Sequence, residues 1–478
     1  MLLIALILVP LVAAGVAYFL PAALRAVLLI GVALLHVALV FALWVTPGHR
    51  VLDGWLADDP LGRLILSLTS VLFLALSHYA VGYLREENPR GGRAFVSCML
   101  GFLAAATLVA VSHQFALLWI GMETTTLAVA PMIYHRHDRR SLEAVWKYLV
   151  LSSVGIAFAL LGVFLLATSQ PSVGAGRPLV LDDMLAHATA LDPMWLRAAF
   201  VFILIGFGTK MGLAPMHSWK PDTYGEAPSL VGGLMGGALT ACAFLGLARV
   251  VSICFAAGQE AFVRPPLIGF GLLSLIVATA FIIGQGDVKR LLGYSSVEHM
   301  GLLVLALGIG GVGAYGAVLH ALNNGIAKAM VFLAVGNVTL ATGSSTADRI
   351  RGLLRSMPAS GTLLVIGLFA VTGSPPFGMF ISEFTIITAA VETHPWLAAV
   401  MLVLLSVIFV GIAQMILEIV YGRPEPGDVP AERGRERPWL VLAPAALATL
   451  TLVLGIYLPS RLAAALSSAA QTLGGHAP

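Results

Sequence analysis

Ionisable side chains inside long apolar segments are the residues of this chain most able to do chemistry. Glu123 lies in WIGMETTTLAV, and Lys210 lies in IGFGTKMGLAP. Farther along, His320 and Lys328 share the segment LHALNNGIAKAMVFL, and Glu383 lies in GSPPFGMFISEF. Ionisable groups at membrane depth are costly to bury, and they mark proton relays and ion pathways. We therefore expect these five side chains to form a route for protons or ions, and we expect no catalytic centre in the chain.

The spacing of His320, Asn324 and Lys328 places all three on one face of a predicted helix, because they are four residues apart. At 1.5 Å of rise per residue, this polar stripe extends along about 12 Å of helix. The Asn-Asn-Gly segment at 323–325 is poor helix-forming sequence and favours a local interruption. Carbonyl groups freed at membrane depth are tolerated only beside a polar cavity.

Glu123 and Lys210 carry opposite charges, and their pairing would suit a pump. A change in the distance between a buried lysine and a glutamate changes how tightly the lysine holds its proton. The alternative is a structural ion pair that locks two helices together. The polar stripe and the second acid, Glu383, favour the route over the structural pair.

Membrane helices must position these residues. The 478-residue chain is 59% hydrophobic and 11% charged, whereas soluble proteins are about 25% charged. This composition predicts an all-α polytopic membrane protein with about fourteen membrane helices of about 20 apolar residues each. The predicted helices are 2–20, 24–45, 62–83, 95–113, 115–134, 147–168, 197–216, 228–250, 265–284, 298–311, 314–341, 362–388, 396–421 and 439–460. The tenth of them is short, and Glu298 and His299 lie at its start.

Two of these helices contain strong helix-breaking sequence. The seventh carries Gly206, Gly208 and Gly212 and precedes Pro215, and the twelfth contains Ser-Pro-Pro at 374–376. Proline removes a hydrogen bond from the helix ladder. Broken helices at corresponding places in two halves are typical of transporters built from inverted repeats. We therefore expect helices 7 and 12 to be broken, and helix 11 to be interrupted as well.

The distribution of basic residues predicts the orientation. Most of the 27 Lys and Arg residues lie in the odd-numbered loops, Lys220 among them, and two, Lys210 and Lys328, lie within helices. Cytoplasmic loops carry an excess of Lys and Arg. We therefore expect both termini on the non-cytoplasmic side of the cell's inner membrane.

Several classes of function are disfavoured. A net charge of +3 does not suggest a nucleic-acid binder. Cys98, Cys242 and Cys254 are too few and too widely spaced for an iron–sulfur cluster or a zinc site. A GxGxxG match at 308–316 lacks the strand–turn–helix context of a dinucleotide site. We expect no cofactor and no metal in this chain.

Four segments resemble the antiporter-like subunits of respiratory complex I. They are KMGLAPMHSWKPDTYGEAPS (210–229), DVKRLLGYSSVEHMG (287–301), HALNNGIAKAMVFLAVGN (320–337) and GSPPFGMFISEF (373–384). The same family includes subunits of membrane-bound hydrogenases and of multisubunit cation/proton antiporters. The likeness extends over about residues 95–420. The sequences YSSVEHMG and PPFGMFISEF are most similar to those of hydrogenase-4 component F type subunits.

The resemblance implies a fourteen-helix fold with two inverted five-helix repeats and a proton route along the membrane midplane. It divides the chain into helices 1–3 (1–94), a first repeat of helices 4–8 (95–258), a second repeat of helices 9–13 (259–421), a cytoplasmic linker (422–438), and helix 14 with the C-terminal tail (439–478).

The resemblance also implies roles for single residues. The five buried side chains match positions of the family's proton route: Glu123 in helix 5, Lys210 in helix 7, His320 and Lys328 in helix 11, and Glu383 at the exit in helix 12. Asn324 stands where some relatives have histidine. His217 and Asp222 fall in the family's PxHxWxPD segment, where they could admit protons or simply fix the loop.

One departure from the family concerns helix 8. Many relatives carry a central lysine there, whereas this chain has Ala241 and no charged residue in the helix before Arg249. Thr240 and water could bridge the gap, or this chain could have lost conduction.

The function implied is that of a proton-translocating subunit in a redox-driven membrane complex, either hydrogenase- or formate hydrogenlyase-like or NADH-quinone oxidoreductase-like. The expected partners are other integral membrane subunits and a peripheral redox arm that holds nickel–iron or iron–sulfur centres. Three alternatives stay open. They are a subunit of a multisubunit sodium/proton antiporter, a non-conducting structural subunit of such a complex, and a subunit of a complex that handles inorganic carbon.

Overall fold

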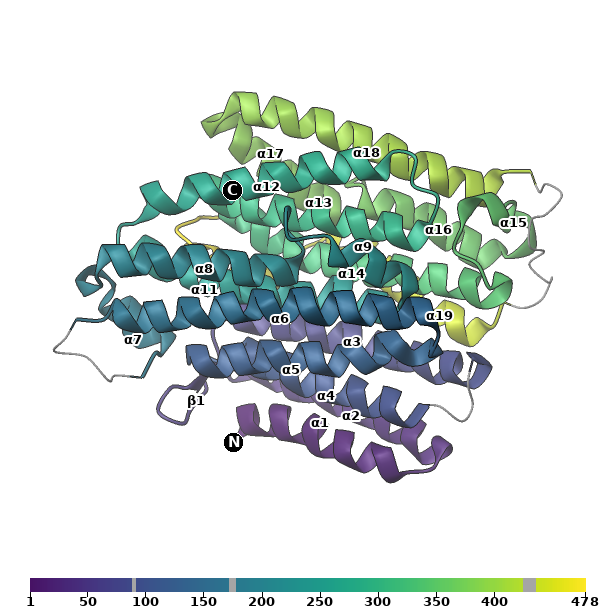
Figure 1. Ribbon diagram of the computed structural model, residues 1–478, viewed down its shortest axis with the longest axis horizontal. Coiled ribbons are helices and arrows are strands. Elements are labelled where there is room, and N and C mark those ends of the chain that lie inside the picture. Colours follow the sequence, from purple (N-terminus) through teal and green to yellow (C-terminus); the bar gives the residue numbers. More distant parts are fainter. Residues whose placement is uncertain (88–91, 172–177, 424–435) are drawn as a thin grey trace.

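The computed structural model of the chain describes residues 1–87, 92–171, 178–423 and 436–478. The described residues form a bundle of helices that run mostly along the long axis of the molecule, with α1 at one edge and α18 at the other (Figure 1). The first half contains α1 (Leu2–Phe19), α2 (Ala22–Val45), α3 (Pro60–Glu87), α4 (Gly92–Val111), α5 (Phe115–Ile133), α6 (Arg139–Thr168), α7 (Leu181–Ala186), α8 (Pro193–Met211), α9 (Trp219–Glu226), α10 (Ser229–Leu234) and α11 (Thr240–Ala256). A short antiparallel hairpin of β1 (Arg50–Val51) and β2 (Leu56–Ala57) follows α2.

The second half contains α12 (Glu260–Ile282), α13 (Val288–Ile309), α14 (Val312–Thr342), α15 (Leu353–Ser356), α16 (Pro358–Val371), α17 (Gly378–Thr393), α18 (Pro395–Tyr421), α19 (Pro438–Ile456) and α20 (Ser460–Thr472). A π-helical segment at Met235–Leu239 joins α10 to α11, so the chain crosses from Ser229 to Ala256 as one helical span.

Thirteen helices of the described residues are long and apolar enough to cross a membrane. The predicted all-α polytopic class is therefore confirmed. The remaining predicted segment, 362–388, is divided between α16 and α17, and the Pro-Pro pair at 375–376 lies between them. Similarly, α8 ends at Met211, and α9 follows as a separate short helix.

The predicted interruption of helix 11 is wrong, because α14 is continuous through the Asn-Asn-Gly segment at 323–325. Packing against other helices offsets its poor intrinsic propensity. Asn323 Nδ2 donates to the carbonyl oxygen of Gly378 at 2.7 Å. Gly325 has the Leu68 side chain where a Cβ would lie. These residues therefore serve contacts with α17 and α3.

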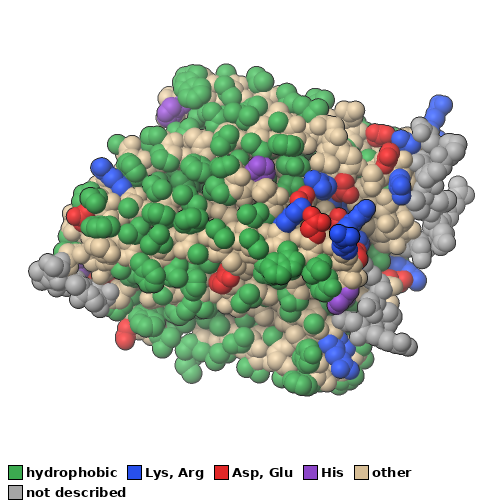
Figure 2. All heavy atoms as spheres, in the orientation of Figure 1, with side chains coloured by type: hydrophobic (Ala, Val, Ile, Leu, Met, Phe, Trp, Pro, Cys, Tyr) green, Lys and Arg blue, Asp and Glu red, His purple; other side chains and the backbone are tan. Residues whose placement is uncertain are grey.

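The burial pattern separates a core from a lipid-facing rim. The spans α10–α11, α13 and α14 are almost wholly buried, whereas α1, α2, α12, α18 and α19 leave most of their residues at least partly exposed. Figure 2 shows apolar side chains over most of one face, with the Lys, Arg, Asp and Glu side chains of that face gathered mainly towards one end. The ionisable residues predicted in the route lie mainly on or beside the buried core.

A network of buried ionisable groups around Arg249 holds one end of α11 in place. Arg249, in α11, donates to Asp59 Oδ1 at 2.7 Å and to the carbonyl oxygen of Ala110 at 2.8 Å. His113 Nε2 lies 3.1 Å from Asp59 Oδ1, and His113 Nδ1 lies 3.4 Å from Asp182 Oδ1. This Arg249 network ties α11 to the loops that precede α3 and α5.

The Arg249 network shifts the proton affinity of its members. Burial raises the pKa of Asp59, but the Arg249 guanidinium and the His113 hydrogen bond outweigh it, and the pKa lies well below its ordinary range. Burial lowers the pKa of His113, but hydrogen bonds to Asp182 and Asp59 outweigh it and leave this pKa raised. Relative to the same groups in water, the network therefore favours the ionised form of Asp59 and the protonated form of His113.

Candidate functional site

Glu123 of α5 and Lys210 of α8 are connected through Thr126. Thr126 Oγ1 donates to Glu123 Oε2 at 3.2 Å, and Lys210 Nζ donates to Thr126 Oγ1. The same Thr126 hydroxyl lies 3.3 Å from the carbonyl oxygen of Met122, which is its alternative acceptor. Ser153 Oγ of α6 donates to Glu123 Oε1 at 3.2 Å. The predicted pair is thus joined through a hydroxyl group. A change in the charge of Glu123 can alter the hydrogen bonding of this hydroxyl and thereby affect Lys210.

Aromatic rings enclose Lys210, which is fully buried in the last turn of α8. Its Nζ lies 5.4 Å from the ring centre of Tyr148, a distance at which a cation is attracted to the ring. The Tyr148 ring in turn contacts that of Trp219 at 5.2 Å between centroids. Trp219 Nε1 donates to the carbonyl oxygen of Thr209 at 2.9 Å, which holds α9 against the end of α8.

A second cluster surrounds Lys328 of α14. Lys328 Nζ donates to Ser295 Oγ of α13 at 2.6 Å. Ser295 Oγ donates to Glu298 Oε2 at 3.2 Å and lies 3.5 Å from His299 Nε2. All four side chains are buried. Ser295 therefore joins the Lys328 ammonium to both a carboxyl group and an imidazole.

The Lys328 cluster continues to Glu383 of α17. His299 Nδ1 lies 3.2 Å from His320 Nε2 and 4.0 Å from Glu383 Oε1. His320 Nδ1 lies 3.0 Å from Ser382 Oγ. The structure thus brings His320, Lys328 and Glu383 into one cluster, with His299 between them. Imidazole can accept a proton on one nitrogen and release one from the other, so the position of His299 is suited to proton transfer.

Sequence reasoning missed Ser295, Glu298 and His299 as members of the route. The predicted helix began at 298, which placed Glu298 and His299 at a helix end, whereas α13 begins at Val288 and places them in its interior. The signal that could have found this start is Asp287, whose carboxylate accepts hydrogen bonds from the backbone N–H groups of Lys289 and Arg290.

Three of these groups could also hold a metal ion. The ligand atoms of His299, His320 and Glu383 all lie within 4.8 Å of one another. The ammonium group of Lys328 interacts electrostatically with His299 and with Glu383, and a positive neighbour disfavours a bound cation. We therefore interpret the cluster as a proton relay, and the absence of a metal site stays a prediction.

Asn324 and Thr240 contribute differently. Asn324 is buried in α14, and its Oδ1 has no hydrogen-bond partner among the described residues. The Thr240 hydroxyl donates to the carbonyl oxygen of Gly236, one turn earlier along its own span, at 2.8 Å. That bond occupies the single proton of the Thr240 hydroxyl. Among the described residues, Thr240 makes no hydrogen bond with Lys210 or Lys328 that would support the predicted bridging role.

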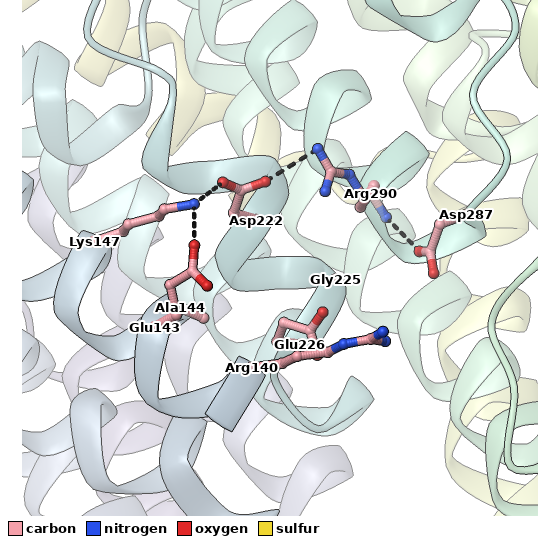
Figure 3. A pocket seen from close by; sticks show the side chains of 9 residues that line it. All are labelled: Arg140, Glu143, Ala144, Lys147, Asp222, Gly225, Glu226, Asp287 and Arg290. Carbon is pink, nitrogen blue, oxygen red and sulfur yellow. Dashed lines mark hydrogen bonds and ion pairs between the residues drawn. The ribbon is translucent and has the colours of Figure 1, made fainter. Parts of the chain in front are cut away.

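Asp222 lies in a charged cleft of about 510 Å³. The cleft is lined by Arg140, Glu143, Ala144, Lys147, Asp222, Gly225, Glu226, Asp287 and Arg290 (Figure 3). Asp222 forms ion pairs with Lys147 and with Arg290, each at 3.0 Å, and so clamps α9 between α6 and α13. Burial and the nearby charge of Lys220 lower the pKa of His217, although a hydrogen bond at Pro215 opposes them.

Lys220 is a residue that the sequence placed in a loop and that the structure buries completely. It lies on α9, two residues before Asp222, and two residues correspond to about 200° around a helix. Lys220 therefore points into the core while Asp222 faces the cleft. Its Nζ donates to the carbonyl oxygen of Met211 and reaches that of Ser296 at 3.5 Å.

Comparison with known proteins places this arrangement in a family. Residues 112–409 match the family described as NADH:quinone oxidoreductase/Mrp antiporter, TM. The chain is 32% identical to a hydrogenase-4 component F homolog of Methylacidiphilum infernorum (isolate V4), over 84% of this chain and 85% of that protein. It is 30% identical to NADH-quinone oxidoreductase subunit N of Desulforudis audaxviator (strain MP104C), over 86% and 83% of the two chains.

The fold is shared with a subunit of an archaeal respiratory membrane complex, the membrane-bound sulfane sulfur reductase. The two chains superpose with a TM-score of 0.88 at 23% sequence identity, over 99% of this chain and 98% of that chain. The match in sequence covers both charged clusters, and the match in fold covers nearly all of the chain. This multi-pass membrane protein therefore belongs to the NADH:quinone oxidoreductase/Mrp antiporter transmembrane family.

Proposed function

We propose that the chain is the proton-translocating subunit of a redox-driven membrane complex, of the hydrogenase or the NADH-quinone oxidoreductase type. The observation that carries the proposal is the buried series Lys328, Ser295, His299 and Glu383, in which consecutive groups lie 2.6, 3.5 and 4.0 Å apart. Buried titratable groups at such spacings are characteristic of proton relays in pumps. The named relatives support the redox-driven type.

The proposed mechanism is electrostatic. A change of charge in a partner subunit alters the influence of Glu123 on Lys210 through Thr126. Lys210 then releases a proton towards Lys328, which passes it through Ser295 and His299 to Glu383. Glu383 has one carboxylate oxygen without a hydrogen-bond partner among the described residues, which suits a group that alternately binds and releases a proton.

The proposal assigns the energy source to partners. Those partners are other integral membrane subunits and a peripheral arm with nickel–iron or iron–sulfur centres. We further propose that 95–258 and 259–421 are inverted repeats, that 1–94 and 439–478 flank them, and that both termini lie outside the cytoplasm. Purification of the native complex through a tag on this chain, followed by mass spectrometry, identifies the partners. Recovery of a lone soluble, non-redox partner would contradict the assignment and favour another role, such as the handling of inorganic carbon.

Transport measurements test the route itself. Lys328→Met should abolish proton uptake by inverted membrane vesicles while the complex stays intact, because methionine keeps the length of the side chain but carries no proton. Lys147→Met, at a lysine with 44% of its side chain exposed, is the matched control. Full proton uptake in Lys328→Met vesicles with an intact complex would favour the non-conducting structural role.

The sodium/proton antiporter is a second candidate, because the matching family includes Mrp antiporters. Such a subunit could use the same buried groups with sodium as the counter-ion. Replacement of all sodium by choline should leave proton transport unchanged under our proposal. A strict requirement for sodium would favour the antiporter.

A further inference from the structure

The two charged clusters of the route are separated by a gap. The Lys210 cluster contains Thr126 and Glu123, and the Lys328 cluster contains Ser295 and His299. Before Arg249, the central span from Ser229 to Ala256 carries no ionisable side chain except Cys242, and Arg249 is held in the network at one end of the core. A proton needs a group that binds it between these clusters, because an isolated charge is energetically costly in the low-dielectric interior.

Lys220 lies beside both clusters. Its ammonium group donates to the carbonyl oxygen of Met211, the residue that directly follows Lys210. It also reaches the carbonyl oxygen of Ser296, the residue that directly follows Ser295 in the Lys328 cluster. One side chain thus contacts the backbone beside both clusters. Lys220 and Lys328 are both completely buried, and the charge of Lys328 acts on Lys220.

The backbone makes room for Lys220. Gly212 has φ +77, a left-handed conformation that ends α8 and favours glycine. The side-chain carbons of Lys220 lie where a Cβ of residue 212 would be. Any larger residue there would therefore strain the turn and displace the lysine.

Buried hydroxyl groups lie near Lys210 and near Lys220. The hydroxyl groups of Tyr148, Tyr224 and Ser296 are buried and make no hydrogen bond of normal geometry within the described part of the chain. The Tyr148 hydroxyl faces Thr126, and the Tyr224 hydroxyl faces Ser296. Lys220 Nζ lies 5.8 Å from the ring centre of Tyr224. Buried polar groups of this kind are satisfied by water, and water can carry a proton between lysines that do not touch.

We propose that Lys220 is the central proton carrier of this chain, between Lys210 and Lys328. The neutral amine of Lys220 accepts a proton that the Lys210 ammonium releases through water, and only N–H and O–H bonds form and break. The Lys220 ammonium then gives this proton to the neutral amine of Lys328. Repulsion between the two ammonium groups disfavours protonation of both at once, so the pair of lysines holds one proton at a time. This inference rests on the proton-translocating function proposed above.

Three substitutions at Lys220 test the inference in native complexes in inverted membrane vesicles. Lys220→Met and Lys220→Gln remove the carrier, and proton uptake should fall by about a hundredfold, as expected for loss of a group that transfers protons. Lys220→Arg keeps the positive charge but should transport no better, because a guanidinium group does not release its proton. Arg461→Met and Arg461→Lys, at an exposed arginine of α20, are the controls.

Each outcome decides the question. Full proton uptake by Lys220→Met or Lys220→Gln overturns the inference. Full uptake by Lys220→Arg also overturns it, because positive charge alone then suffices. Failure of the complex to assemble with both Met and Gln assigns Lys220 a structural role instead. Lys328→Met, measured in parallel, separates the inference about Lys220 from the proposed proton-translocating function. If Lys328→Met is inactive while Lys220→Met transports normally, only the role of Lys220 fails, whereas full uptake in both removes the proposed function.

Discussion

Glu123→Gln offers a direct test of the electrostatic coupling, because it removes a charge and leaves the shape of the side chain. The glutamine amide can still accept hydrogen bonds from Thr126 or Ser153, so the packing of α5 against α6 and α8 should persist. Any loss of transport would then report the missing charge. We expect the complex to assemble normally.

The magnitude follows from the geometry. Two hydrogen bonds that share the Thr126 oxygen separate the Glu123 carboxylate from the Lys210 ammonium by at most about 6 Å. At an effective dielectric constant of about 20, the interaction of two unit charges at that distance is about 3 kcal/mol. A barrier raised by this amount slows a step by roughly a hundredfold. Glu123 is only half-buried, so screening reduces the effect, and we expect a decrease of between about tenfold and a hundredfold.

The assay is the initial rate of proton uptake by inverted vesicles, followed with a pH-sensitive dye and driven by the redox reaction of the intact complex. Glu143→Gln is the matched control, because Glu143 is exposed and pairs with Lys147 at 2.8 Å. A wild-type rate for Glu123→Gln in a fully assembled complex would refute the coupling through Thr126. Failure to assemble would favour a purely structural pair.

Four further predictions follow from the described contacts. His299→Asn should lower proton uptake at least about tenfold with the complex intact, because asparagine cannot relay a proton; full uptake would remove His299 from the route. Arg249→Met should lower the free energy of unfolding by about 3–5 kcal/mol, because it leaves Asp59 without its main partner; thermal unfolding in detergent measures this, and an unchanged midpoint contradicts it. Since the pKa of His113 is raised, its stabilising contribution is full below its ordinary range and is lost as the pH rises through the raised value, so alkaline pH should speed amide hydrogen exchange in the neighbouring loops, and His113→Gln should remove that pH dependence. Asp222→Asn should retain most of the proton uptake, because its ion pairs are partly exposed and worth about 1 kcal/mol or less each; loss of uptake would assign Asp222 a role in admitting protons.

The sequence was sufficient for the class of fold, because a span of about 20 apolar residues is a local property of the chain. It was also sufficient to predict that Lys210, Lys328 and Glu383 are buried, because they are charged residues within apolar segments. Helix boundaries were less predictable. The polar residues at the start of α13 are typical of a loop, although Asp287 caps the helix there.

Features that depend on tertiary packing could not be predicted. Lys220 lies in a short segment with a proline and neighbouring charges, a composition typical of a loop, and nothing local indicates that α9 turns it into the core. The continuity of α14 depends on Asn323 and Gly378, which are 55 residues apart. Local propensity predicts a break at such a site, and packing decides otherwise.

The single proton of the Thr126 hydroxyl has consequences for the speed of coupling. Glu123 Oε2 and the carbonyl oxygen of Met122 compete for it at 3.2 and 3.3 Å, while Lys210 donates to the same oxygen. The hydroxyl therefore works as a two-position rotor, and its reorientation moves one hydrogen atom and no heavy atom. Such motion takes far less time than enzyme turnover at about 1–1,000 per second. Under the proposed mechanism, the signal from Glu123 thus reaches Lys210 without delay, and slower events elsewhere in the complex set the pace of pumping.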